Sequence, residues 1–179
     1  METVLFLDVD GTILPSSHEE ADRVEEIGIP HVIPGQTKTV HGFTWTEQDK
    51  IIFNPRDIPV KESIVNFLTE VKDKVKIVWL TGWEDNAHIL EPFFNLPECE
   101  VLFWDKEAMS FHENEKKDAL KFWLKQHPEV KKFIWADDCA PLAEDNADLE
   151  ETHEVLIITP DPVTAINNDE IVKMINFIS

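Results

Sequence analysis

The chain has 179 residues, 42% of them hydrophobic, with six Trp and eleven Phe. This composition suits one folded domain with a packed core and excludes a chain that is disordered throughout. Because 16 basic residues stand against 36 acidic ones, for a formal net charge of −20, we expect no non-specific binding to duplex nucleic acid, which depends on many Lys and Arg contacts with phosphates.

Five short apolar runs alternate with amphipathic helical patterns along the chain. Continuous apolar runs are typical of strands that are buried on both faces of a parallel sheet. The runs cover residues 4–7, 75–80, 100–104, 133–136 and 155–158. Apolar residues recur at helical spacing over residues 60–71, 86–94, 117–126 and 168–178. The alternation predicts an α/β fold, with a Rossmann-like, mostly parallel sheet and helices on both faces. Asn167 or Asn168 is expected to cap the last helix.

Residues 13–59 interrupt this alternation, and Pro and Gly recur throughout the segment. Residues 19–27 are a candidate for a short helix. Residues 40–45 and 50–53 alternate apolar with polar residues on either side of a polar turn, which predicts a β-hairpin. We therefore expect a single domain over residues 1–179, with a small β-hairpin cap inserted at about residues 13–59, above the carboxyl ends of the strands.

The apolar run near the N-terminus is too short for a signal peptide, because it ends at Asp8. No other stretch approaches the length of a membrane span. The two cysteines, Cys99 and Cys139, are too few for a disulfide framework. We expect a cytoplasmic protein with reduced thiols and no membrane partner.

Two carboxylates directly follow the first predicted strand. Residues 5–12 read Leu-Phe-Leu-Asp-Val-Asp-Gly-Thr, so that Asp8 and Asp10 stand at the strand end and Gly11 allows the chain to turn. Ligands of open α/β sheets gather at that edge, and a hard cation such as Mg2+ would compensate the two charges. An ordinary Asp-Gly turn is the alternative. A calcium loop is excluded, because a strand precedes the motif and Ile13 occupies the position that needs Gly.

Two further predicted strands end in polar residues. Residues 78–83 read Val-Trp-Leu-Thr-Gly-Trp, and the Thr81 hydroxyl and the backbone amides beyond it are suited to bind phosphate oxygens. A plain turn is the alternative. Residues 133–139 read Phe-Ile-Trp-Ala-Asp-Asp-Cys. The adjacent charges of Asp137 and Asp138 are costly unless a cation or hydrogen bonds relieve them, and a helix cap is the alternative.

A pair of lysines stands near the start of the third predicted helix, where residues 115–118 read Glu-Lys-Lys-Asp. A lysine among carboxylates and phosphate would hold the charges together as a compact cation. Lys116 is the first choice and Lys117 the alternate. A lysine that only faces solvent is the non-functional interpretation.

Three buried strands that end in Asp-x-Asp-Gly, Thr-Gly and Asp-Asp, in that order, resemble the haloacid dehalogenase-like (HAD) phosphohydrolase superfamily over roughly residues 3–160. The first and fourth motifs are specific, whereas the second and third are permissive. Finer features are similar to a small group of HAD domains from bacteria and phages, some of which are associated with RNA repair. These are the Thr-Gly-Trp turn with Asn86-Ala87, Trp-Ala-Asp-Asp at residues 135–138 and Thr-Pro-Asp-Pro-Val-Thr at residues 159–164.

The resemblance implies a Mg2+-dependent phosphomonoester hydrolase that works through an aspartyl-phosphate intermediate. Asp8 matches the nucleophile and Asp10 the general acid/base. The phosphate-binding positions match Thr81, Gly82 and Lys116, with Lys117 as the alternate. The metal would be held by Asp8, the backbone carbonyl of Asp10 and Asp137, with Asp138 acting through water.

The substrate class follows less directly. We expect a phosphorylated substrate, either a nucleotide or the terminal phosphate of a nucleic acid. Trp45, Trp83 and Trp104 are candidates for stacking on a base, and core packing is the alternative for all three. Two other functions stay open: a non-catalytic HAD-like module that binds a metal or a partner, and a phosphotransferase that acts on a small metabolite.

Overall fold

The computed structural model describes residues 3–15, 37–40, 43–46, 51–53, 59–103, 115–140, 146–162 and 164–179. Its main sheet contains β1 (Thr3–Leu7), β6 (Val75–Trp79), β7 (Glu100–Val101), β8 (Lys132–Ala136) and β9 (Glu154–Ile158). The strands lie in the order β7-β6-β1-β8-β9, and every neighbouring pair is parallel. The predicted α/β fold with a mostly parallel sheet is confirmed.

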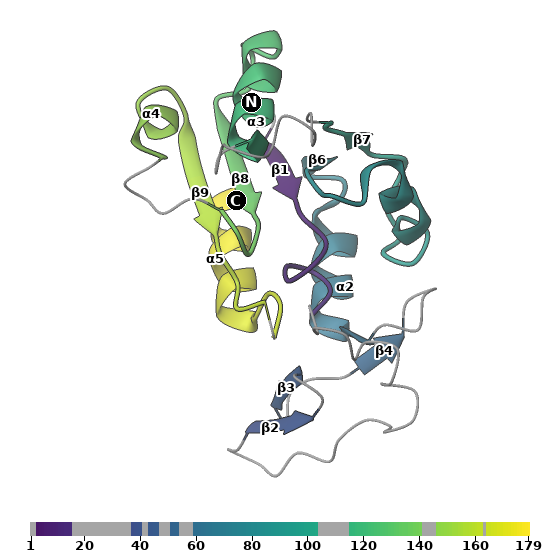
Figure 1. Cartoon of the computed structure of the whole chain (residues 1–179). Helices are drawn as coiled ribbons and strands as arrows, with labels where there is room; N and C mark the ends of the chain where they lie inside the picture. Colours follow the sequence, from purple (N-terminus) through teal and green to yellow (C-terminus); the bar gives the residue numbers. More distant parts are fainter. Residues whose placement is uncertain are drawn as a thin grey trace.

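Helices cover both faces of this sheet (Figure 1). The helices α2 (Glu62–Val71) and α5 (Asn168–Ile178) pack on the face that carries Leu5 and Leu7. The helices α3 (Glu115–Gln126) and α4 (Ala147–Glu150) pack on the face that carries Val4 and Phe6. Alternate side chains of a strand point to opposite faces, and all of β1 is buried. The strand that leads to Asp8 is therefore held between two hydrophobic cores.

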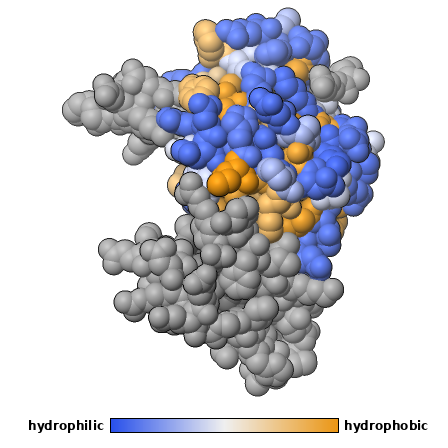
Figure 2. Space-filling view, turned by 90° about the vertical axis from the view of Figure 1, so that its right-hand side faces the viewer, coloured by the Kyte–Doolittle hydropathy of each residue, from blue (hydrophilic) through white to orange (hydrophobic). Residues whose placement is uncertain are grey.

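Asn167 caps α5. Its side chain accepts a hydrogen bond from the Glu170 backbone N–H at 3.0 Å, and its own backbone N–H donates to Glu170 Oε2 at 2.8 Å. This reciprocal pair is a capping box, which satisfies two donors at the helix start. Of the two predicted caps, Asn167 is the one that the structure shows. Among the residues that Figure 2 colours by hydropathy, hydrophilic ones predominate and hydrophobic ones form small patches.

The helix predicted over residues 86–94 is wrong in type and length. Residues 84–90 instead form a 3-10 helix, η2 (Glu84–Leu90), and the chain leaves it before Pro92. Proline cannot continue a helix, because it lacks the N–H donor and its ring clashes with the preceding turn.

The third predicted strand is also shorter than expected, since β7 covers only two residues and Trp104 lies outside the described residues. The short helix α4 was not predicted.

The predicted hairpin between residues 40–45 and 50–53 is wrong in its pairing. The strand β2 (Thr37–Val40) pairs antiparallel with β3 (Phe43–Thr46), and β4 (Ile51–Phe53) pairs antiparallel with β5 (Pro59–Lys61). The sequence leaves only two residues, His41 and Gly42, between β2 and β3, and so short a connection favours a hairpin of neighbours. Figure 1 places both small sheets beyond the carboxyl ends of the main strands. The candidate helix at residues 19–27 lies outside the described residues.

Candidate active site

The carboxyl ends of β1, β6 and β8 meet at one edge of the main sheet. The strand order reverses between β1 and β8, and open α/β sheets bind ligands in the crevice at such a switch point. Backbone hydrogen bonds continue just past the strands, from Asp8 N to Ala136 O at 3.0 Å and from Asp137 N to Ile158 O at 3.0 Å. They fix the points where Asp8 and Asp137 leave the sheet side by side.

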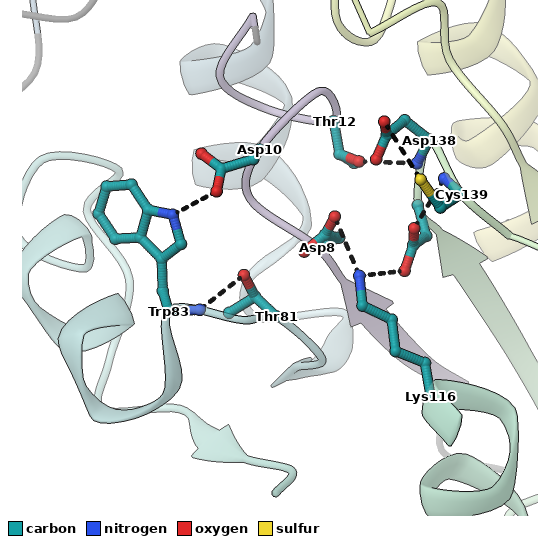
Figure 3. Close-up of polar contacts among 9 residues, drawn as sticks. Asp8, Asp10, Thr12, Thr81, Trp83, Lys116, Asp138 and Cys139 are labelled. Carbon is teal, nitrogen blue, oxygen red and sulfur yellow. Dashed lines mark hydrogen bonds and ion pairs between the residues drawn. The ribbon is translucent and has the colours of Figure 1, made fainter. Parts of the chain in front are cut away.

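Lys116 joins these two carboxylates. Its Nζ lies 3.1 Å from Asp8 Oδ2, a contact that Figure 3 draws, and 2.7 Å from Asp137 Oδ2. Both aspartates are buried, whereas the Lys116 side chain, from the first turn of α3, stays 24% exposed. Lys117 points elsewhere, with its Nζ 2.7 Å from Asp148 Oδ1. Of the two predicted lysines, the structure places Lys116 against Asp8.

The cluster of Asp8, Asp137, Asp138 and Lys116 contains three carboxyl groups and one lysine, and its burial makes the negative charges costly. Burial, and then the nearby Asp137 charge, raise the pKa of Asp8 from 3.8 to about 7, against the opposing effects of Lys116 and the Val9 backbone amide. Burial and Asp137 also raise the pKa of Asp138. Burial alone would lower the pKa of Lys116, but the charges of Asp8 and Asp137 outweigh it and raise the pKa. One lysine therefore does not compensate the carboxylates around it.

The turn after β1 packs tightly against Asp138. Gly11 has a φ of +71°, a backbone conformation that residues other than glycine rarely adopt. Its N–H donates to Leu14 O at 2.7 Å. The buried Thr12 hydroxyl accepts a hydrogen bond from the Asp138 backbone N–H at 3.0 Å. The first and fourth motifs are thus joined by direct contacts.

Asp10 is exposed, and its carboxylate is turned toward Trp83 (Figure 3). The indole Nε1 of Trp83 donates to Asp10 Oδ2 at 2.8 Å. From the sequence, Trp83 was predicted as part of the Thr-Gly-Trp turn and as a stacking or core residue, but this bond was not predicted. Its position directly after Thr81 and Gly82 is the one signal that could have drawn attention to it.

Thr81 is buried at the end of β6, and its hydroxyl accepts a hydrogen bond from the Trp83 backbone N–H at 3.3 Å. A hydroxyl that accepts there keeps its own proton to donate to another group. Gly82 is exposed, and a Cβ atom added to it would meet no atom within 4 Å. The turn is therefore exposed at Gly82 and buried at Thr81.

The donor set at this edge fits a hard divalent cation. Single ligand atoms of Asp137, Asp138 and Cys139 lie within 4.8 Å of one another, and the charge excess around Asp8 would be relieved by a cation. Mg2+ prefers carboxylate and carbonyl oxygens. Cys139 is not one of its preferred ligands, since sulfur is a soft ligand and Mg2+ prefers oxygen, and burial raises the pKa of its thiol. Both cysteines of the chain are free thiols.

A family model described as "HAD domain in Swiss Army Knife RNA repair proteins" matches residues 4–171. The chain belongs to this HAD family. The resemblance found in the sequence is confirmed, and membership of the family indicates a phosphatase-type or related hydrolase role. Neither the curated proteins nor the solved structures contain a match to the chain.

In this HAD family member the matched segment includes every residue of the cluster, from Asp8 to Asp138. Among the described residues, no helix is long and apolar enough to cross a membrane.

Proposed function

We propose that the protein is a Mg2+-dependent phosphomonoester hydrolase with Asp8 as nucleophile and Asp10 as general acid/base. The observation that carries the proposal is the position of Lys116, whose Nζ contacts Asp8 Oδ2 and Asp137 Oδ2 at 3.1 and 2.7 Å. Phosphoryl transfer depends mainly on positioning and on neutralising charge. A buried carboxylate held by a cation at the ligand-binding edge of an α/β sheet meets both needs.

The reaction proceeds in two displacements. A carboxylate oxygen of Asp8 attacks phosphorus, the bond from phosphorus to the ester oxygen breaks, and Asp10 gives its proton to that oxygen. A water molecule then attacks the acyl phosphate and loses a proton to Asp10. The bond from phosphorus to Asp8 breaks, which releases inorganic phosphate and restores both carboxyl groups.

The other residues neutralise charge. The Thr81 hydroxyl, the Gly82 amide and Lys116 bind the phosphoryl oxygens. Asp8, Asp137 and the Asp10 carbonyl would hold Mg2+, with Asp138 acting through water. The ion would supply a positive charge next to the transferring group. Lys117, which pairs with Asp148, takes no part.

The substrate is a nucleotide or the terminal phosphate of a nucleic acid. The family description names RNA repair proteins, whose chemistry includes phosphorylated strand ends. The net charge of −20 opposes non-specific binding along a duplex, so recognition is concentrated at the phosphate itself. The single-domain organisation with a small cap at about residues 13–59 stays a prediction, and of that segment the described strands β2 and β3 form a small sheet beyond the carboxyl ends of the main strands (Figure 1).

The first test measures Mg2+-dependent hydrolysis of p-nitrophenyl phosphate. We expect turnover that EDTA abolishes, that Asp8→Asn removes and that Asp118→Asn retains. Asp118 is a matched control because it is an exposed aspartate on α3, close to Lys116 in the chain. Absence of turnover would favour a non-catalytic metal-binding module and overturn the proposal. Capture of the phosphoryl group by added alcohols in preference to water would show a phosphotransferase.

The second test compares nucleotides, sugar phosphates and oligonucleotides with 3′- or 5′-phosphates. We expect the highest kcat/KM on a nucleotide or an oligonucleotide end. Higher values on sugar phosphates would overturn the assignment of the substrate class while leaving the chemistry intact.

A further inference from the structure

The hydrogen bond between Trp83 and Asp10 joins the turn after β6 to the turn after β1. The indole Nε1 donates to Asp10 Oδ2 at 2.8 Å, and the two residues lie 73 positions apart in the chain. The side chain of Asp10 is exposed. An exposed carboxylate without a fixed partner exchanges between rotamers in water, so this bond restricts where the carboxylate points.

The Trp83 side chain is itself well anchored. It is half-buried and packs against the hydrophobic core beneath η2. Its backbone N–H donates to Thr81 Oγ1 at 3.3 Å, and its carbonyl accepts from Asn86 N at 3.0 Å. The two backbone hydrogen bonds therefore fix the turn that carries Trp83, and packing against the core restricts its ring.

The indole distinguishes between the two oxygens of Asp10. An indole N–H is a donor only, so the oxygen that it contacts accepts and does not carry the carboxyl proton toward the ring. With Oδ2 engaged by Trp83, the proton of a neutral Asp10 is placed on Oδ1. The same indole bond persists when Asp10 is ionised, because a carboxylate oxygen also accepts.

We propose that Trp83 is a positioning residue for Asp10: its indole N–H holds Oδ2, so that Oδ1 exchanges the proton with the leaving group and then with water. This inference rests on the proposed function, in which Asp10 is the general acid/base. Trp83 has no direct part in bond breaking and acts through the carboxyl group that it orients.

The dependence of rate on the leaving group tests this role. An ester with a good leaving group, such as 2,4-dinitrophenyl phosphate, needs little protonation, whereas an alkyl phosphate needs a well-placed acid. In Trp83→Phe, which keeps an aromatic ring and removes the donor, kcat/KM should fall about 10-fold or more on the alkyl ester and change within about twofold on the activated ester. Trp83→Leu, of different volume, repeats the test and should give the same selective loss.

Trp123→Phe is the matched control. Trp123 Nε1 also donates to a carboxylate, Glu100 Oε1 at 2.7 Å, but this pair lies away from the cluster around Asp8. The control should lower stability without changing the ratio of rates on the two esters. A similar selective loss in Trp123→Phe would overturn the assignment of the effect to Trp83.

A double-mutant cycle separates positioning from other roles. In an Asp10→Asn background, Trp83→Phe should change kcat/KM by no more than about twofold, because the group that it orients is already gone. An undiminished loss in that background, or an equal loss on both esters, would overturn the inference and leave the proposed function standing. Absence of Asp8-dependent turnover on every ester would instead remove the proposed function itself.

Discussion

Gly11 and Asp138 lie so close together that a Cβ atom at position 11 would come within 2.5 Å of Asp138 Oδ2. The contact connects the turn after β1 with the acidic pair after β8. It comes in addition to the positive φ of Gly11, so two independent constraints require glycine at this position. The first motif is therefore shaped to fit the fourth.

Replacing Gly11 with Ala should destabilise the protein and weaken Mg2+ binding. The added methyl group strains the backbone and displaces the Asp138 carboxylate, at a cost of about 1–3 kcal/mol. Urea unfolding measures the first effect and Mg2+ titration calorimetry the second. Gly82→Ala is the control for stability, since its Cβ would meet nothing within 4 Å. Equal losses of stability in the two variants would contradict this account of Gly11.

Replacing Lys116 with Met should abolish turnover and reduce stability at neutral pH. Two buried carboxylates would lose the cation that contacts both, so we expect kcat/KM to fall at least about 100-fold and the free energy of unfolding to fall by about 1–3 kcal/mol. Lys117→Met removes the ion pair with Asp148, whose side chain is 43% exposed. It should cost at most about 1 kcal/mol and retain activity. A larger loss of activity in Lys117→Met would assign the motif lysine to position 117.

The raised pKa of Asp8 predicts a pH-dependent effect of Asp8→Asn in metal-free protein. A carboxyl group with a pKa of 3.8 when unfolded and about 7 when folded contributes stability that is fully present below 3.8 and is lost as the pH rises through about 7. Asparagine has no such loss. In EDTA, Asp8→Asn should therefore gain stability relative to the wild type as the pH rises from about 4 to about 7, by about 1 kcal/mol or more.

Urea unfolding of both proteins at several pH values checks this gain. Asp118→Asn, at an exposed position, should show a nearly constant difference from the wild type. Adding Mg2+ should restore stability to the wild type at pH 8 more than to Asp8→Asn. A difference between Asp8→Asn and the wild type in EDTA that did not change over this pH range would contradict the prediction.

Glu91 should be the main polar support of the segment between β6 and β7. Its buried Oε1 accepts from Trp79 Nε1 at 3.0 Å and from the Cys99 backbone N–H at 2.9 Å. Glu91→Leu leaves both donors without an acceptor and should cost about 2–4 kcal/mol, measured by urea unfolding. Glu70→Leu, which breaks an exposed pair with Lys74, should change stability by less than about 1 kcal/mol. Similar costs at the two positions would refute this role for Glu91.

The centre of the main sheet could be predicted from the sequence because β1, β6 and β8 are buried on both faces. Continuous apolar runs such as residues 133–136 identify such strands without knowledge of their partners. The pairing within residues 37–61 could not be predicted in the same way. Alternation there indicates strands, but it does not say which strand neighbours which, and the structure shows two separate pairs.

The candidate site was predictable where strand ends supply the residues. Parallel strands end at the same edge, so the positions of Asp8, Thr81 and Asp137 follow from the strands themselves. Lys116 was harder, because each helical residue turns by about 100° and only the packing of α3 decides which of two adjacent lysines faces the sheet. The bond from Trp83 to Asp10 spans 73 residues and leaves no periodic signal. The chemical roles of these residues stay predictions.

The most direct measurement is to identify the phosphorylated residue during turnover. The enzyme would be mixed with Mg2+ and substrate, quenched in acid within milliseconds, digested and analysed by mass spectrometry. We expect an acid-stable, hydroxylamine-sensitive phosphoryl group on Asp8 that forms and decays at rates consistent with kcat. A phosphoryl group on another residue, or steady turnover with Asp8 never modified, would contradict it.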